Sequence, residues 1–264
     1  MISTPSPKSS ILMPWLTLAA IVGTFIVNVL SNIYPLNGMS IGELSNTMFA
    51  DVLITPANYA FAIWGVIYLG LFAFGTYQVA PAQRSNSTLT PIRPWVIAAC
   101  VAQIVWVYLF LSRLFVGSLV AMIAILVSLI MVYLQCQRAE RLTRADRQLM
   151  NLPFSIYLGW ISVATVVNGA IALYSVGWTG GGLAPAVWTA VMLVVSGAIA
   201  LVLLCQYRDI AFPGVVIWAA VAIALRQAAI PTIAWTAWGV AIGLGLAIAV
   251  STLIYPTNVP RSRI

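Results

Sequence analysis

The side chains of this sequence that could do chemistry are few, and the most prominent of them are aromatic. Trp64, Trp106 and Trp160 each lie well inside a long apolar run. Flat indole faces brought together from three helices would suit a flat apolar ligand, although packing alone is the alternative interpretation for each of them. Serine and acidic residues assemble into no hydrolytic motif, and the acidic residues lie outside the apolar runs. An enzyme is therefore the weaker hypothesis, because nothing here supplies general acid–base groups.

Polar residues within the same runs support a binding site. Tyr157, Trp160, Ala164 and Asn168 follow one another at spacings of three and four residues, so they line one stripe of a helix. Gln103 lies in another run. Such groups are costly when they face lipid, so we expect them to face the protein interior. There they either join helices through hydrogen bonds or orient a ligand.

Metal chemistry is not expected. The chain has no histidine, which removes the commonest zinc and haem ligand. Its three cysteines, Cys100, Cys136 and Cys205, have no metal-ligand spacing. We therefore predict no metal site and no required cofactor.

The composition decides which elements must position these residues. Of the 264 residues, 62% are hydrophobic and 6% are charged, whereas soluble domains carry roughly a quarter charged residues. The apolar residues form unbroken runs of about 20, the length of a membrane-spanning helix. We predict an all-α integral membrane protein with about eight spans. The seventh is short and carries Arg226 near its end, so a re-entrant segment, or a helix that ends early, is the alternative there. The expected helices cover residues 11–34, 57–80, 94–112, 116–136, 152–175, 185–206, 212–228 and 231–254.

The distribution of basic residues predicts the orientation. With eight spans, both termini lie on one side, which collects ten of the twelve basic residues. These are Lys8, Arg84, Arg93, Arg138, Arg141, Arg144, Arg147, Arg208, Arg261 and Arg263. Because short cytoplasmic loops carry the excess of Lys and Arg, we predict that both termini are cytoplasmic. The net charge of +7 is explained in this way and does not indicate nucleic acid.

The longest connection, about 35–56, is rich in apolar residues and is predicted to fold as a lid over a cavity between the helices. A loose connection in the interface is the alternative. Pro56 and Asp51 belong to this connection, and Arg226 lies near the same side at the end of the seventh helix. Arg226 either extends to the interface or pairs with Asp51, with Glu43 or with a ligand carboxylate.

A glycine-rich stretch at 176–184 divides the chain. We predict a five-helix bundle over residues 1–175 and a three-helix C-terminal extension over residues 176–264.

Three segments resemble the tryptophan-rich sensory protein family, also called the translocator protein or TspO/MBR family. Pro56, Trp64 and Tyr68 fall on the family's proline-pair, Val-Trp, Leu-Tyr segment, with Thr55 in place of the first proline. Gln103, Trp106 and Phe110-Leu111 are similar to its Asn-x-x-Trp…Phe-Phe segment. Residues 157–168, read as Tyr-Leu-Gly-Trp-Ile-Ser-Val-Ala-Thr-Val-Val-Asn, are similar to Tyr-Leu-Ala-Trp…Ala-Thr-x-Leu-Asn.

This resemblance covers about residues 11–175 and implies a five-helix bundle that binds porphyrins, sterols or synthetic aromatic ligands beneath the loop after the first helix. It implies that Trp64 and Trp160 line the pocket, and that a homodimer or another membrane protein is a candidate partner. The family's sterol-recognition motif is missing, since Gly169 follows Asn168 and no arginine comes after it. The three C-terminal helices have no counterpart in its short members.

The leading hypothesis is a sensory or regulatory membrane protein that binds a flat apolar ligand, with a metal-free tetrapyrrole favoured. The predicted ligand-binding residues are Trp64, Tyr68, Gln103, Trp106, Tyr157, Trp160, Ala164 and Asn168, with Pro56, Asp51 and Arg226 at the lid. A facilitative transporter and a scaffold or assembly factor that docks through the C-terminal helices are the alternatives. Flux in proteoliposomes would indicate the first, and a stoichiometric membrane partner the second.

Overall fold

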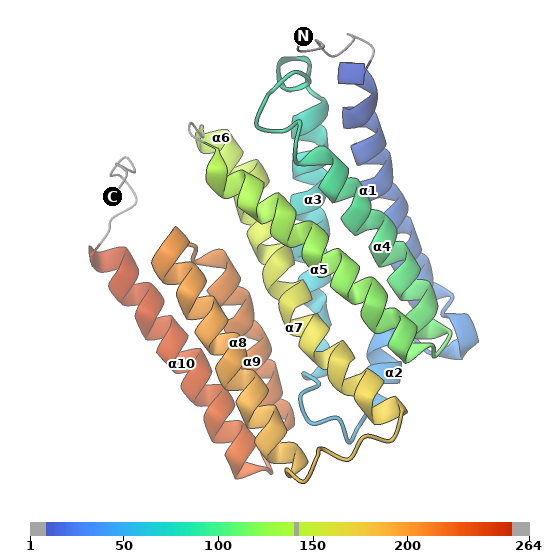
Figure 1. The fold of residues 1–264 in the computed structure, drawn as a ribbon, viewed down its shortest axis with the longest axis vertical. Coiled ribbons are helices and arrows are strands. Elements are labelled where there is room, and N and C mark those ends of the chain that lie inside the picture. Colours follow the sequence, from blue (N-terminus) through green and yellow to red (C-terminus); the bar gives the residue numbers. More distant parts are fainter. Residues whose placement is uncertain (1–8, 140–142, 255–264) are drawn as a thin grey trace.

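The computed structural model describes residues 9–139 and 143–254, and in these ranges it contains helices and connecting turns but no strand. Eight long helices run alternately up and down (Figure 1). They are α1 (Ser9–Ile33), α3 (Ile63–Val79), α4 (Arg93–Leu111), α5 (Phe115–Arg138), α7 (Leu152–Ser175), α8 (Pro185–Tyr207), α9 (Ala211–Arg226) and α10 (Pro231–Ile254). The short elements are η1 (Leu36–Gly38), α2 (Ile41–Thr47), η2 (Asn58–Ala62), η3 (Pro81–Gln83), α6 (Arg144–Asp146) and η4 (Arg147–Asn151).

The helices begin where the sequence supplies suitable residues. Proline lies in the first turn of α4, α7, α8 and α10, where its missing N–H removes no helical hydrogen bond and its fixed φ suits the helix. The connection between α7 and α8 is made by glycines with positive φ at Gly177, Gly180, Gly181 and Gly182. The predicted boundaries therefore agree with the observed ones to within a few residues, except that the predicted helix at 57–80 begins with the 3₁₀ turn η2.

In the part of the chain that the structure describes, seven helices are long and apolar enough to cross a membrane, which agrees with a multi-pass membrane protein. The exception is α9, whose 16 residues extend about 24 Å, short of the roughly 30 Å of hydrocarbon. The predicted seventh helix is thus present but shorter than a span.

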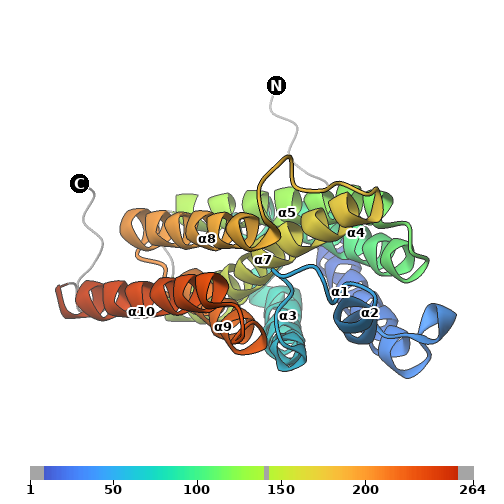
Figure 2. The same ribbon diagram turned by 90° about the horizontal axis from the view of Figure 1, so that it is seen from below.

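Helix α7 lies at the centre of the molecule, in contact with α3, α5, α8 and α9 (Figure 2). On one side of it α1, α3, α4 and α5 complete a five-helix bundle, and on the other side α8, α9 and α10 pack together (Figure 1). The two groups meet closely between α7 and α9, because a Cβ on Gly159 would lie 3.0 Å from the Val215 Cβ. The Ser155 hydroxyl also donates a hydrogen bond of 2.6 Å to Asp209, just before α9.

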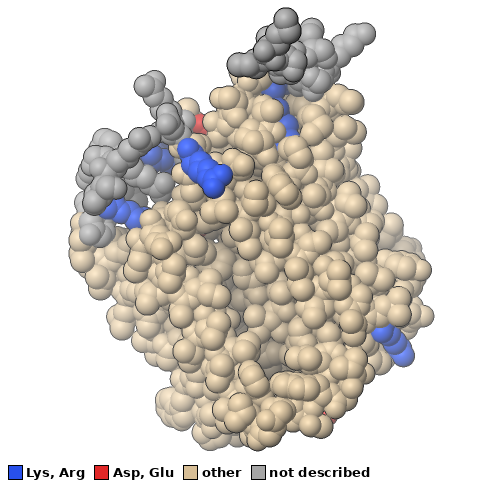
Figure 3. All heavy atoms as spheres, in the orientation of Figure 1, with Lys and Arg blue, Asp and Glu red and all other residues tan. Residues whose placement is uncertain are grey.

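The start of α1 and the end of α10 lie at the same end of the molecule (Figure 1), which we call the terminal end. Most of the basic side chains visible on one face also gather there, and the rest of that face is nearly uncharged (Figure 3). Lys8, Arg141, Arg261 and Arg263 lie outside the described residues. The arrangement agrees with both termini on one side, and the cytoplasmic assignment of that side stays a prediction.

Candidate ligand-binding site

A mostly apolar cavity lies among α3, α4, α5 and α7, next to the connection that follows α1. Its volume is about 40 Å³, enough for a few water-sized groups. Three tryptophans form part of its wall: Trp64 from α3, Trp106 from α4 and Trp160 from α7. The other lining residues are Ile41, Ser45, Pro56, Phe61, Phe110, Met122, Val163, Ala164, Val167, Asn168 and Ile171.

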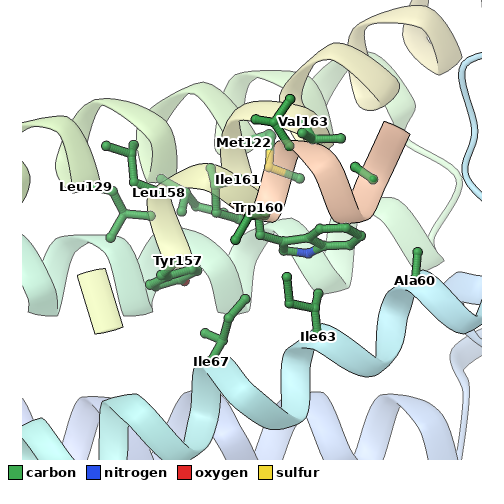
Figure 4. Packing of buried hydrophobic residues seen from close by; sticks show 14 of the residues in the cluster. Ala60, Ile63, Ile67, Met122, Leu129, Tyr157, Leu158, Trp160, Ile161 and Val163 are labelled. Atoms are coloured by element: carbon green, nitrogen blue, oxygen red, sulfur yellow. The ribbon is translucent and has the colours of Figure 1, made fainter. Parts of the chain in front are cut away.

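The tryptophans are held in place by aromatic and apolar neighbours. The Trp160 ring is directed from α7 toward α3 and lies beside Ile63 (Figure 4), and it is only 3% exposed. Its edge contact with Phe61 has a centroid distance of 5.9 Å. Trp106 packs against Phe110 at 5.3 Å. These contacts fix the Trp160 and Trp106 indoles, from α7 and α4, beside the cavity.

Asn168 serves mainly to hold this wall together. Its side-chain oxygen accepts a hydrogen bond of 2.7 Å from the Trp106 indole N–H, and its amide nitrogen donates one of 3.0 Å to Ser118 on α5. Ser118 in turn donates to the Phe115 carbonyl at 2.8 Å. Asn168 therefore lines the cavity while it joins α4, α5 and α7.

Tyr68, Gln103 and Tyr157 do not line the cavity but form a polar layer one helical turn away from the tryptophans. The Tyr157 hydroxyl donates to the Gln103 side-chain oxygen in a short hydrogen bond. The Gln103 amide donates to the Tyr68 hydroxyl at 3.0 Å, and Tyr68 donates to the Thr24 carbonyl of α1 at 3.4 Å. All three side chains are less than 5% exposed. The predicted hydrogen-bonding residues are thus satisfied by one another, and rings of this layer contact Trp64 at 5.7 and 6.0 Å.

The connection after α1 is ordered and covers the cavity. It contains α2, which begins with a capping box in which Ser40 and Glu43 satisfy each other's backbone N–H groups. Hydrogen bonds from the Ser40 backbone and side chain hold the pKa of the Glu43 carboxyl below its ordinary value. Ile41 and Ser45 of this helix reach the cavity wall. We call residues 40–57 the lid, and most of its large apolar side chains are buried, among them Leu44, Phe49 and Ile54, whereas Met48 is 39% exposed.

The two charged residues predicted at the lid lie there but do not pair with each other. Asp51 accepts a hydrogen bond of 3.3 Å from the Tyr174 hydroxyl at the end of α7. The Arg226 guanidinium donates a short hydrogen bond to the Asn46 side chain and one of 3.3 Å to the Pro56 carbonyl. Pairing of Arg226 with Asp51 or Glu43, one of the alternatives that the sequence left open, is therefore not observed, and both carboxylates have other partners.

Several lining residues were missed from the sequence although a signal was present. The Ser40-Ile-Gly-Glu43 segment has the capping-box pattern, which predicts the start of the lid helix α2. The stripe on α7 extends with the same periodicity through Val167 and Ile171. Met122 and Phe110 carry no such signal, because their position depends on how α4 and α5 pack against α7.

Comparison with known proteins identifies the family. The sequence model of one family, described as TSPO-like protein, matches residues 14–250. This range continues through α8, α9 and most of α10, beyond residue 175 where the segment resemblance ended. No curated protein and no solved structure matches the chain. Since the match covers most of its length, the chain belongs to the TSPO-like protein family.

Proposed function

We propose that this protein is a membrane-embedded binding protein, with a sensory or regulatory role, for a flat apolar ligand of the tetrapyrrole class. The observation that carries the proposal is the convergence of Trp64, Trp106 and Trp160 on one mostly apolar cavity beneath an ordered lid. Indole faces stack on flat conjugated rings, and water is excluded by the surrounding apolar side chains.

The cavity would have to widen before it could hold a tetrapyrrole. Sites for ligands of drug size usually have volumes of about 300–1,000 Å³, whereas this cavity has about 40 Å³. A tetrapyrrole would therefore enter only after the lid and the indoles move apart. The lid is the part of the wall that does not belong to a long helix, so it is the part that can move with the least loss of packing.

The test is a titration of the full-length protein in detergent with protoporphyrin IX, followed by tryptophan fluorescence. We expect saturable quenching in the wild type and an affinity about tenfold lower in the Trp64→Phe/Trp160→Phe variant, because stacking is worth about 0.5–1.5 kcal/mol per ring. Trp235→Phe is the matched control, since Trp235 is 76% exposed on α10, far from the cavity wall. Equal affinities in the double variant and the control would remove the assignment of the site.

A further inference from the structure

The lid is attached to α9 through the side chains at the end of that helix. Arg226 donates hydrogen bonds to the Asn46 side chain and, at 3.3 Å, to the Pro56 carbonyl. Gln227, directly after α9, donates from its side-chain amide to the Leu53 carbonyl at 3.0 Å. These contacts join positions at least 170 residues apart in the sequence. Three points along the lid are thus held by two consecutive residues.

The last residue of the lid and the turn η2 that leads into α3 lie along α9. The Ala57 N–H donates to the Ala222 carbonyl at 3.2 Å. The Trp218 indole N–H donates to the Ala60 carbonyl at 3.0 Å, and its ring meets Tyr59 edge-on at 5.2 Å. Two backbone groups of this connection, the Ala57 N–H and the Ala60 carbonyl, therefore have their hydrogen-bond partners on α9.

The closed position of the lid carries a free-energy penalty at Thr55. The Thr55 hydroxyl is completely buried and has no hydrogen-bond partner among the residues that the structure describes. A buried hydroxyl without a partner destabilises the conformation that buries it, so opening the lid would relieve this penalty. Valine has nearly the same shape as threonine and lacks the hydroxyl, so Thr55→Val would favour the closed lid.

We propose that α9 is a latch for the lid, with Arg226 as its main contact, and that ligand exchange requires this latch to release. The inference rests on the proposed binding function and adds its regulation. Pro56 connects the two features, because it lines the cavity while its carbonyl accepts from Arg226. An element with two arrangements, biased one way by Arg226 and the other way by Thr55, is a switch that the C-terminal helices can control.

Hydrogen–deuterium exchange of the ligand-free, full-length protein in nanodiscs tests the latch directly. In Arg226→Met we expect the backbone amides of residues 41–55 to exchange about tenfold faster, because a charge-assisted contact to the lid is lost. In Thr55→Val we expect them to exchange more slowly than in the wild type. Arg113→Met is the matched control and should leave lid exchange unchanged. It removes the other basic residue that the sequence places on the side opposite the termini, in the turn between α4 and α5.

Unchanged lid exchange in Arg226→Met, with α4 and α7 as protected as in the wild type, would overturn the proposal. If Arg226→Met does not fold, Gln227→Ala carries the same expectation and the same overturning result. The outcome separates the two proposals, because no ligand is present in the exchange experiment. Faster lid exchange in Arg226→Met, without saturable binding of protoporphyrin IX by the wild type, would support the latch and contradict the proposed ligand. Saturable binding, with lid exchange unchanged in Arg226→Met, would contradict only the latch.

When both proposals hold, the dissociation rate of protoporphyrin IX should rise and fall with the exchange rate of the lid amides. We expect faster dissociation from Arg226→Met and slower dissociation from Thr55→Val than from the wild type. Equal dissociation rates in the two variants would overturn the claim that exchange proceeds through the latch.

Discussion

Two adjacent layers inside the bundle are built from the same three helices and differ in what their side chains do. The tryptophan layer takes one residue each from α3, α4 and α7, namely Trp64, Trp106 and Trp160. The polar layer takes Tyr68, Gln103 and Tyr157 from the same helices, displaced by three or four residues toward the terminal end. The first layer lines the cavity, and the residues of the second layer do not line it.

The contrast indicates that the first layer should determine ligand affinity and the second should determine stability. The polar layer is filled by hydrogen bonds that run from α7 through α4 and α3 to the Thr24 carbonyl of α1, so it holds four helices in register. The Trp64 and Trp160 indole N–H groups have no hydrogen-bond partner in the described part of the chain. Substitutions in the first layer should therefore change ligand affinity, and substitutions in the second should change the free energy of unfolding.

The largest expected effect comes from filling the cavity. Ala164 is the smallest side chain on the wall, facing the space from α7. In Ala164→Phe the ring would occupy that space, so we expect protoporphyrin IX affinity to fall by about a hundredfold or more, the equivalent of roughly 3 kcal/mol of overpacking in the complex. The melting temperature should stay within a few degrees of the wild type, since the ring enters an existing cavity.

Leu173→Phe provides the control for this variant, because Leu173 lies on the same helix and is 42% exposed. It should bind like the wild type. Wild-type affinity in Ala164→Phe would place the ligand outside the tryptophan layer.

The next effect concerns the polar layer. In Gln103→Leu the Tyr157 hydroxyl loses its acceptor, and we expect the free energy of unfolding to fall by about 2 kcal/mol, the cost of a buried donor without a partner. Reversible unfolding in mixed micelles measures it. Adding Tyr157→Phe should recover part of the loss, because the orphaned hydroxyl is then absent. Additive losses, or a large loss of ligand affinity in folded Gln103→Leu, would contradict the division between the layers.

The sequence predicts the helices well, because long apolar runs bounded by proline and glycine leave little choice of structure in lipid. The predicted helix at 152–175 coincides with α7. The spacing of Trp160, Ala164 and Asn168 also placed them on one wall, since helical periodicity alone decides which residues share a face.

The sequence could not predict how one helix is shifted along its neighbours. Tyr68, Gln103 and Tyr157 are polar residues on the inner faces and were expected at the ligand together with the tryptophans. Whether they reach the cavity or one another depends on axial offsets of a few ångströms between α3, α4 and α7, which side-chain packing sets. The same holds for Arg226, whose partner Asn46 lies 180 residues away in the chain.

A smaller effect is expected beyond the polar layer, where α3 passes close to the start of α7. A Cβ on Gly70 would lie 2.9 Å from the Pro153 Cβ, a ring that cannot rotate away. We expect Gly70→Ala to lower the free energy of unfolding by about 1–2 kcal/mol through overpacking. Gly65→Ala on the same helix has nothing within 4 Å and should be neutral or slightly stabilising. Equal effects of Gly70→Ala and Gly65→Ala on thermal unfolding would show that the contact between α3 and α7 can relax to accept the extra methyl group.

The smallest effect concerns the lid helix that covers the tryptophan layer. Because the pKa of Glu43 is lowered in the folded lid, its contribution to α2 is present above the ordinary carboxyl pKa and is lost as the pH falls through the lowered value. Lid exchange in Glu43→Gln should therefore exceed that of the wild type at neutral pH, and the difference should disappear in acid. Comparing the two proteins at each pH cancels the intrinsic pH dependence of exchange. A difference that persists at the acidic end would mean that the capping box owes its effect to geometry and not to the carboxylate charge.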